Sequence, residues 1–291
     1  MIRILTDSAS DLTATDSARP GVYTVPLSVT FADGTGGLDG VELTADEFYA
    51  HLKVDKVPPR TSQPSPQSFM TIFEDAKENG DQVIAILISS NLSGTYQCAR
   101  LAAESCDFED VFFVDSRTAS QGEAILVREA LRLRDEEHLP AHAIVAELEQ
   151  LKQRIRILAV VDSLKHLQKG GRVSAAVALV GGALGIKPVL SLYDSRIQLE
   201  DKGRGRPGAL VAMFKLLEKM GGVDPDYGYT LLYTDDRQLA APVHHYMHNN
   251  LHLTGGRVGQ VGATIGTHIG PRAVGLAFVP SGGHAALAAE S

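Results

Sequence analysis

The feature that most constrains this chain is an alternation of short apolar runs with helical patterns through its first half. The apolar runs span 2–7, 22–31, 83–88, 111–115 and 157–162. Runs without polar alternation are typical of strands that are buried on both faces, as in a parallel sheet. Amphipathic patterns between the runs predict helices at 44–53, 65–79, 94–105, 122–137 and 142–155. The alternation therefore predicts an α/β fold, with an open and mostly parallel sheet flanked by helices.

The pattern changes after about residue 162, where the predicted strands become more polar. The segment 187–202 predicts a hairpin that turns near residues 193–195. Further strands are expected at 227–236, 258–270 and 273–280, and helices near 208–220 and 237–252. Because alternating polarity is typical of antiparallel sheets, we predict two domains. These are an N-terminal α/β domain of residues 1–160 and a C-terminal α+β domain of residues 161–291 with a largely antiparallel sheet.

Composition and charge argue against several classes of protein. The net charge of -8 argues against a nucleic-acid backbone or an anionic membrane surface as the main partner. The two cysteines, Cys98 and Cys106, cannot build a disulfide framework or a metal quartet. The segment 1–10 lacks the apolar run of a secretory signal, and the apolar stretch 173–186 is too short to span a membrane. We therefore expect a cytoplasmic protein with no stable membrane insertion, no nucleic-acid partner, no metal and no cofactor.

Four polar loops, rich in hydroxyl groups, follow predicted strands or open predicted helices. They are 6–11, 61–66, 89–95 and 115–122. In an α/β sheet, ligands bind at the carboxyl ends of the strands. Unpaired N–H groups at a helix start favour an anion, and nearby hydroxyls add hydrogen-bond donors. The loops therefore indicate a site for a carboxylate or a phosphate, although a hydroxyl in any single loop more often caps its own helix.

Capping signals support two of the predicted helices. Ser65 is expected to be an N-cap residue, with Pro66 in the first helical position. Thr44 and Glu47 have the spacing of a capping box. Both helices should therefore begin next to these residues.

Two motifs resemble phosphate-binding loops, and we reject both. The segment 203–208 matches the dinucleotide pattern G-x-G-x-x-G, but the strand before it is polar and Pro207 occupies the turn that should meet the pyrophosphate. Its Arg204 and Arg206 remain candidates for holding an anion. The segment 169–174 lacks the spacing of a P-loop, so we interpret it as a helix end followed by a new helix start.

A surface role is also expected for three histidines. His244, His248 and His252 are spaced so that they share one helical face. No carboxylate or cysteine accompanies them at a useful interval, which favours a solvated face over a metal site.

A stand-alone enzyme is the alternative that the residues leave open. Ser93, His268 and Asp115 are the residue types of a serine hydrolase. The chain lacks the G-x-S-x-G elbow on which α/β hydrolases hold their nucleophile. A serine hydrolase or a small-molecule transferase that uses Ser93 and His268 therefore stands as the second hypothesis.

Nine motifs recur in the same order in the DegV family, and together they make the chain resemble that family. They are TDSASDL (6–12), VPLSVTF (25–31), DGVELTADEFY (39–49), TSQPSP (61–66), LSGTY (92–96), LKHLQKGGRVS (164–174), IKPVL (186–190), KGRGRPGAL (202–210) and HIGPRAVGL (268–276). The resemblance implies a protein that binds a long-chain fatty acid, similar to the binding subunit of bacterial fatty acid kinase. There, a separate kinase subunit phosphorylates the bound carboxylate, and the acyl phosphate feeds phospholipid synthesis. The chain is thus expected to be a lipid-binding subunit and not an enzyme by itself.

The resemblance also implies a head-group site. Thr61 and Ser62 match the pair that binds the fatty-acid carboxylate in the family. Ser93 matches another head-group contact, with Gly94 and Thr95 beside it. The carboxylate is expected at the domain interface, and the acyl chain in the second domain beside a helix of small residues at 174–185.

Two further residues match positions that the family links to a kinase. Arg204 and His268 correspond to residues of kinase engagement or phosphoryl transfer. The segment HIGPRAVG departs from the family because Arg272 stands where a glycine is usual. If the glycine serves a positive φ, an arginine there is strained. Arg272 is expected either to strain this turn or to add a cation near the head group.

Overall fold

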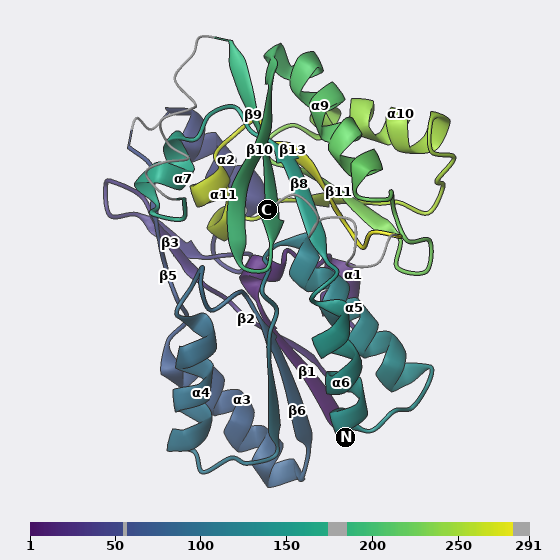
Figure 1. Cartoon of the computed structure of the whole chain (residues 1–291). Helices are drawn as coiled ribbons and strands as arrows, with labels where there is room; N and C mark the ends of the chain where they lie inside the picture. The colour runs from purple at the N-terminus through teal and green to yellow at the C-terminus, as the bar shows by residue number, and fades with distance from the viewer. Residues whose placement is uncertain (55–56, 174–184, 282–291) are drawn as a thin grey trace.

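The computed structural model describes residues 1–54, 57–173 and 185–281, and its first half contains a parallel sheet in the order β2-β1-β6-β7. The strands are β1 (Ile2–Asp7), β2 (Val22–Val25), β6 (Gln82–Leu87) and β7 (Val111–Asp115). The helices are α3 (Pro66–Asn79), α4 (Thr95–Ser105), α5 (Gln121–Asp135) and α6 (Ala141–Leu151). Figure 1 shows α3 and α4 on one side of this sheet and α5 and α6 on the other. The arrangement confirms the predicted α/β layer.

Successive residues of the central strands pack on opposite faces of this sheet. Leu5 of β1 lies in one buried cluster with Phe73 of α3. Its neighbour Ile4 lies in a second buried cluster with Leu126 of α5 and Ile144 of α6. All five side chains have an exposed fraction of 0 %. The apolar runs of the central strands β1 and β6 are therefore buried on both faces, whereas most residues of the edge strands β2 and β7 are only partly buried.

A small antiparallel sheet, in the order β4-β3-β5, lies beside the first. Its strands are β3 (Ser28–Thr30), β4 (Gly36–Leu38) and β5 (Arg60–Ser62). The prediction of one continuous strand over 22–31 is wrong, because the chain leaves the parallel sheet after Val25 and enters this one at Ser28. Pro26 lies at the break, and proline cannot donate a ladder hydrogen bond. The small sheet places Thr61 opposite Val29.

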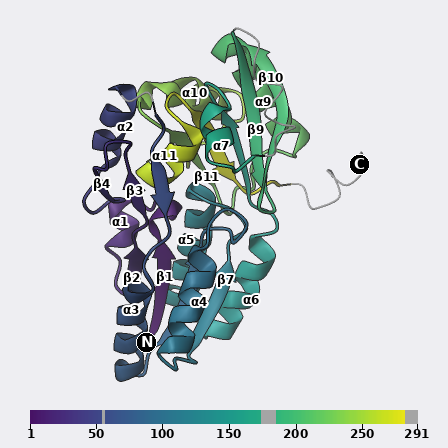
Figure 2. The same cartoon turned by 90° about the vertical axis from the view of Figure 1, so that its left-hand side faces the viewer.

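The second half forms a six-stranded sheet in the order β10-β9-β8-β13-β11-β12. The strands are β8 (Arg156–Val160), β9 (Ile186–Tyr193), β10 (Arg196–Arg204), β11 (Tyr229–Tyr233), β12 (Arg257–Gln260) and β13 (Val274–Phe278). All pairs are antiparallel except β11 with β12. Helices α9 (Gly205–Lys219) and α10 (Ala241–Asn249) cover one face, and Figure 2 shows this sheet above the parallel one. A largely antiparallel second sheet is thereby confirmed.

Two sequence predictions for the second half need correction. The run 157–162 was expected in the parallel sheet, but β8 pairs antiparallel with β9 and β13. An apolar run reports burial on both faces and does not report strand direction. The segment 258–270 was expected to be one strand, yet only its start belongs to β12, and α11 (Ala263–Ile269) follows. β8 thus belongs to the second sheet, although its residues lie before the predicted domain boundary at residue 160. The division of the chain into two domains stays a prediction.

Local signals were predicted more accurately than these long-range pairings. Ser65 is the N-cap of α3, where its hydroxyl accepts the N–H of Ser68. Thr44 and Glu47 form the expected capping box at the start of α2 (Ala45–Val54). The hairpin of β9 and β10 turns at Asp194 and Ser195, whose φ values of 45° and 66° suit a tight primed turn. Each of these features depends on a few neighbouring residues.

An ion pair is buried at the outer end of the parallel sheet. The Nη2 and Nε atoms of Arg3 lie 2.7 and 2.8 Å from Oδ2 of Asp81. The two side chains are only 4 % and 5 % exposed. Asp75 also accepts a hydrogen bond from Arg3, but that carboxylate is 56 % exposed. Arg3 therefore joins the start of β1 to the turn after α3.

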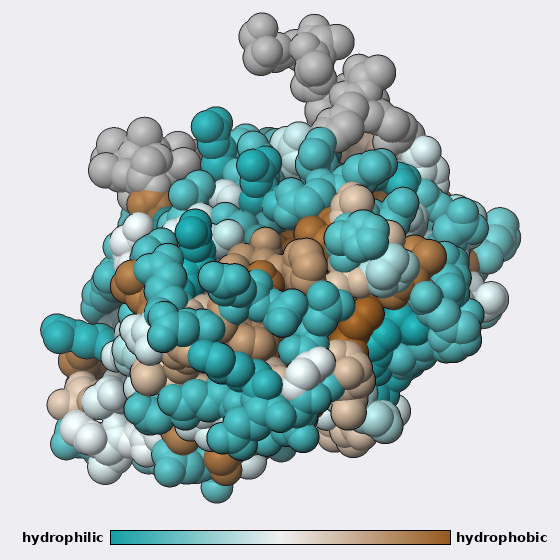
Figure 3. Space-filling view, turned by 90° about the horizontal axis from the view of Figure 1, so that it is seen from below, coloured by the Kyte–Doolittle hydropathy of each residue, from teal (hydrophilic) through white to brown (hydrophobic). Residues whose placement is uncertain are grey.

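Among the residues that the structure describes, no helix has the length and apolar character needed to cross a membrane. Seen from below, most of the surface is hydrophilic, and the hydrophobic residues of that face gather mainly toward its middle (Figure 3).

Candidate functional site

The main pocket lies between the six-stranded sheet and the first half of the chain. Its space amounts to about 970 Å³, including the part that opens to solvent. One wall is the face of the six-stranded sheet that α9 and α10 leave uncovered. The opposite wall comes from the loops after β2, β6 and β7, with α11 and α7 (Lys165–Lys169) at one side. The pocket is therefore lined by both halves of the chain.

The sheet wall of the pocket is apolar. Leu190 and Leu192 of β9 and Leu232 of β11 line it. The two central strands contribute the small residues Ala159 and Gly275, which pair with each other across β8 and β13. Small residues in the middle of this wall, with leucines around them, leave a trough along the sheet.

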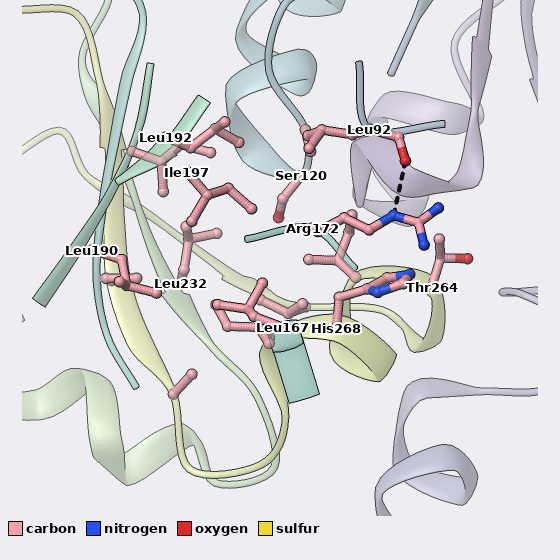
Figure 4. A pocket seen from close by; sticks show the side chains of 18 of the residues that line it. Leu92, Ser120, Leu167, Arg172, Leu190, Leu192, Ile197, Leu232, Thr264 and His268 are labelled. Atoms are coloured by element: carbon pink, nitrogen blue, oxygen red, sulfur yellow. Dashed lines mark hydrogen bonds between the residues drawn. The ribbon is translucent and has the colours of Figure 1, made fainter. Parts of the chain in front are cut away.

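The other end of the pocket is polar. Figure 4 shows Arg172, Thr264 and His268 on one side and the leucines of the sheet on the other. Thr61 and Ser93 line the same pocket from the first half of the chain. The pocket therefore joins an apolar trough to a cluster of hydrogen-bonding groups, an arrangement that suits an amphiphilic ligand.

Thr61 and His268 are in direct contact at the polar end. The Oγ1 atom of Thr61 lies 3.0 Å from Nε2 of His268. Thr61 belongs to β5 and His268 to the last turn of α11, so residues far apart in the sequence meet here. Because β5 pairs with β3, the small sheet fixes the position of Thr61.

Ser93 reaches the pocket from the turn that opens α4. Its backbone N–H donates to the carbonyl of Ser89, and its Oγ accepts the N–H of Thr95. The hydroxyl of Thr95, which is fully buried, lies 2.8 Å from the hydroxyl of Ser93. Thr95 therefore holds Ser93 in place from behind, and only Ser93 of the two lines the pocket.

Burial keeps the imidazole of His268 neutral. Burial is the main cause that lowers the pKa of His268 to about 4, and the positive charges of Arg172 and His166 add to it. At neutral pH the ring therefore carries one proton on one nitrogen. Its Nδ1 atom is buried without a hydrogen-bond partner among the described residues. Nε2 is thus the nitrogen that serves the site.

The predicted site residues are brought together in part. Thr61, Ser93 and His268 share the pocket. Ser62 and Gly94 are exposed and do not line it, and Arg204 is exposed at the end of β10. Their proposed roles therefore stay predictions, as does the role of every residue in this site. The expected helix at 174–185 falls on residues 174–184, which lie outside the described part of the chain.

Arg172 is a pocket residue that the sequence did not single out. Its Nε donates to the carbonyl of Leu92 over 3.1 Å (Figure 4). Its Nη1 donates to the carbonyl of Gly170. The residue is exposed, so it marks the mouth of the pocket. From the sequence, we interpreted the segment KGGR as a helix junction and gave Arg172 no role.

Arg272 has the backbone conformation that its place in the motif suggested. Its φ is 61°, in the left-handed region that favours glycine. Its N–H donates to Asp235 over 2.6 Å, and its carbonyl accepts from Arg206 over 2.9 Å. Its side chain is 63 % exposed and does not line the pocket. The turn is therefore strained as expected, and the alternative of an added head-group cation receives no support.

The side chains of the hydrolase alternative have other partners. The carboxylate of Asp115 accepts hydrogen bonds from Ser90 and from the N–H of Arg117. The hydroxyl of Ser93 pairs with Thr95, and Nε2 of His268 pairs with Thr61. A nucleophile, base and orienting acid would need to contact one another in sequence. This arrangement does not favour that alternative.

The histidines of α10 lie on the surface of the protein. His244 and His248 stack at 6.2 Å between ring centroids, and both are exposed. Within residues 1–54, 57–173 and 185–281, no group of three or more histidine, cysteine or acidic side chains could hold a metal ion.

A family model described as "Uncharacterised protein, DegV family" matches residues 1–281. A DegV domain-containing protein of Deinococcus radiodurans is 36% identical over 284 residues, which cover 96% of this chain and 98% of that protein. Another, of Caldanaerobacter subterraneus, is 35% identical over 277 residues, which cover 95% of this chain and 98% of that protein.

Solved structures with a similar fold include proteins described as binding fatty acids. The structure of a DegV family protein from Thermus thermophilus, described as fatty-acid binding, is 33% identical, with a TM-score of 0.84. The matched region covers 96% of this chain and 99% of the Thermus thermophilus chain. A stearic-acid-binding protein from Eubacterium ventriosum is 27% identical and has the same TM-score of 0.84, with 96% of this chain and 98% of its own covered.

Proposed function

Because the chain belongs to the DegV family, we propose that it binds a long-chain fatty acid. The carboxylate binds at Thr61 and Ser93, and the acyl chain lies in the trough of the six-stranded sheet. The observation that carries this proposal is a single pocket that joins an apolar trough to uncharged hydroxyls. The fatty-acid-binding proteins of the same fold support it.

The energetics of the trough suit a long chain. Burying about 14 methylene groups yields roughly 11 kcal/mol at about 0.8 kcal/mol each. The costs of immobilising the ligand remove part of this free energy. The remainder still corresponds to tight binding. A head-group site of modest strength is therefore sufficient, since its task is to fix the orientation of the ligand.

The head-group geometry gives each polar group a role. If Nε2 of His268 carries the proton, it donates to Oγ1 of Thr61. The hydroxyl proton of Thr61 is then directed toward the carboxylate. Ser93 supplies a second donor, and Arg172 adds a positive charge at the mouth. Hydrogen bonds to a charged acceptor are stronger than neutral ones, so two hydroxyls bind a carboxylate effectively.

The finer function follows from the family resemblance. The protein presents the carboxylate to a separate kinase subunit in the cytoplasm, and the acyl phosphate enters phospholipid synthesis. The chain itself is not the enzyme. An exposed mouth next to Arg172 and His268 supports this role, because a phosphoryl donor must reach the carboxylate from outside.

Native mass spectrometry of the protein purified from cells tests the basic proposal. A co-purified mass that matches a fatty acid is the expected result. Hydrolysis of ester substrates by the isolated protein, with no bound fatty acid, would instead establish the hydrolase alternative.

Thr61→Ala and Ser93→Ala are each expected to weaken fatty-acid binding by about 1–2 kcal/mol, because each removes a hydrogen bond to a charged acceptor. Titration with a fluorescent fatty acid measures the change. Ser90→Ala is the matched control, since Ser90 lies in the same loop as Ser93 but bonds to Asp115. Equal affinities for the three variants and the wild-type protein would refute the head-group assignment.

Ala159→Phe is expected to block the trough. The new ring should weaken binding of a chain of about 16 carbons roughly tenfold or more, and that of a chain of about 8 carbons much less, because only the long chain needs the whole trough. Ala159→Val gives an intermediate step in volume. If both chain lengths lose affinity equally while the melting temperature falls, the ring has only overpacked the core.

Arg204→Ala and His268→Ala separate binding from phosphoryl transfer. Fatty-acid affinity should stay within about 1 kcal/mol, the order of one hydrogen bond. Kinase-dependent formation of acyl phosphate should fall about a hundredfold, because charge develops on the phosphoryl oxygens in the transition state. Parallel assays of lipid binding and acyl phosphate measure both. Full kinase-dependent activity in both variants would remove these two residues from the proposal.

A further inference from the structure

Helix α11 carries much of the polar end of the pocket, although it is short. It spans seven residues, Ala263–Ile269, and provides Thr264, Ile265 and His268 to the pocket. A helix of two turns is not stable by itself in water. Its N-cap is Gly262, which has no side chain to accept the free N–H groups of the first turn. Something outside the helix must therefore hold its start.

Two carboxylates from the far end of the sequence accept these N–H groups. Oδ1 of Asp11 accepts from Gly262 over 2.8 Å. The two oxygens of Asp39 accept from Ala263 and Thr264, each over 3.0 Å. The carboxylates precede the helix by more than two hundred residues. Burial raises the pKa of both Asp11 and Asp39, so it is their hydrogen bonds, made from the first half of the chain to the second, that satisfy the helix start.

Gly262 makes this approach possible. A Cβ atom at residue 262 would lie 2.8 Å from Oδ1 of Asp11 and 3.3 Å from Oδ1 of Asp39. Any side chain there would push both carboxylates away. The glycine therefore serves the contact between the two halves.

The two carboxylates are themselves fixed. Asp39 is 5 % exposed, and its N–H donates to the carbonyl of Leu27 over 2.8 Å. Asp11 has a φ of 51°, and its second oxygen accepts from the hydroxyl of Ser120, which lines the pocket. Tyr49 of α2 adds a bond to the carbonyl of Val261 over 3.0 Å. The start of α11 thus rests on a rigid set of groups.

The other end of α11 reaches the head-group site. His268 lies one turn after Thr264, and its Nε2 meets Thr61. Thr61 belongs to the first half of the chain, as do Asp11 and Asp39. The helix is therefore held at both ends by the first half, and a shift at its start would move the histidine away from Thr61.

We propose that Asp39 and Asp11 are positioning residues that hold α11 against the first half of the chain, so that His268 stays on Thr61. Without them the helix start loses its acceptors, the two halves separate at this point, and the polar end of the pocket opens to water. The effect on lipid binding rests on the proposed function. The effect on α11 does not.

The test compares Asp39→Asn and Gly262→Ala with Asp33→Asn. An asparagine at residue 39 keeps one acceptor and turns an N–H₂ group toward the second N–H. Gly262→Ala disturbs the same contact from the helix side and leaves both carboxylates present. Asp33 is the matched control, because its exposed carboxylate accepts backbone and hydroxyl hydrogen bonds from Thr35 in the β3–β4 turn and not from the start of α11.

Three measurements apply to each ligand-free variant and to the wild-type protein. Amide hydrogen exchange at 263–269 should accelerate about tenfold or more in Asp39→Asn and Gly262→Ala, the order expected for one or two lost hydrogen bonds. In an NMR titration, the pKa of His268 should rise from about 4 toward its ordinary value of 6.5 as the ring gains solvent. Affinity for a fluorescent fatty acid should fall by up to about fivefold, the same limit of about 1 kcal/mol that is expected for His268→Ala. Asp33→Asn should change none of these.

The outcomes separate this inference from the proposed function. An unchanged pKa of His268 and unchanged exchange in both variants would overturn the positioning role, whatever happens to lipid binding. A raised pKa with faster exchange supports the positioning role even if the wild-type protein binds no fatty acid, in which case only the proposed function fails. If Asp39→Asn does not fold, Gly262→Ala decides the question alone.

Discussion

Between pH 4 and pH 7, Asp7→Asn is expected to gain stability relative to the wild-type protein as the pH rises. Asp7 is fully buried, and burial raises its pKa from 3.8 to about 7, with the charge of Asp39 adding to the shift. The N–H groups of Ala9 and Ile88 donate to its carboxylate and oppose the shift. In the folded protein the group therefore keeps its proton in this window, whereas in the unfolded chain it loses the proton.

The sign follows from proton binding. Where the unfolded state binds fewer protons than the folded state, the free energy of unfolding falls as the pH rises. Asp7 thus stabilises the fold fully below about pH 4, and this contribution is lost as the pH approaches 7. Asparagine does not titrate. The difference in unfolding free energy between variant and wild type should therefore increase by about 4 kcal/mol across the window.

His268→Gln is the opposite test. The pKa of His268 is lowered from 6.5 to about 4, so the unfolded chain binds more protons between these values and the wild-type protein gains stability as the pH rises. Removing the histidine should make the variant lose up to about 3 kcal/mol relative to wild type from pH 4 to pH 6.5. Urea unfolding at several pH values measures both series. Differences that do not vary with pH would show that neither group is held in the stated protonation state.

Asp81→Ala is expected to lower the free energy of unfolding by about 3–5 kcal/mol, because it leaves the buried guanidinium of Arg3 without its main partner. Breaking one side of a buried pair costs the desolvation of the remaining charge. The effect should not depend strongly on salt, since both side chains are nearly inaccessible to ions.

Asp75→Ala is the matched control for that loss. Asp75 bonds to the same arginine, but its carboxylate is 56 % exposed. Exposed pairs contribute about 0–1 kcal/mol, and salt screens them. Chemical denaturation of the two variants at low and high salt makes the comparison. Similar losses for Asp75→Ala and Asp81→Ala would mean that Arg3 is not effectively buried.

The sequence by itself determined the features that depend on neighbouring residues. The capping box of Thr44 and Glu47, the N-cap at Ser65 and the turn at Asp194 each arise from a few side chains and one backbone turn. Apolar runs also located the buried strands, because a strand that is buried on both faces carries apolar side chains at successive positions. The hydroxyls of Thr61 and Ser93 were placed near helix starts for the same local reason, and both line the pocket.

Only the tertiary structure decided which strands pair and what holds α11. An apolar run does not encode its direction, so β8 was expected among parallel strands and lies between antiparallel ones. The N-cap of α11 is Gly262, which has no side chain to cap the helix, so the local sequence did not predict a helix start there. Its start depends on Asp11 and Asp39, whose carboxylates come from more than two hundred residues away and act only once the two halves of the chain have met.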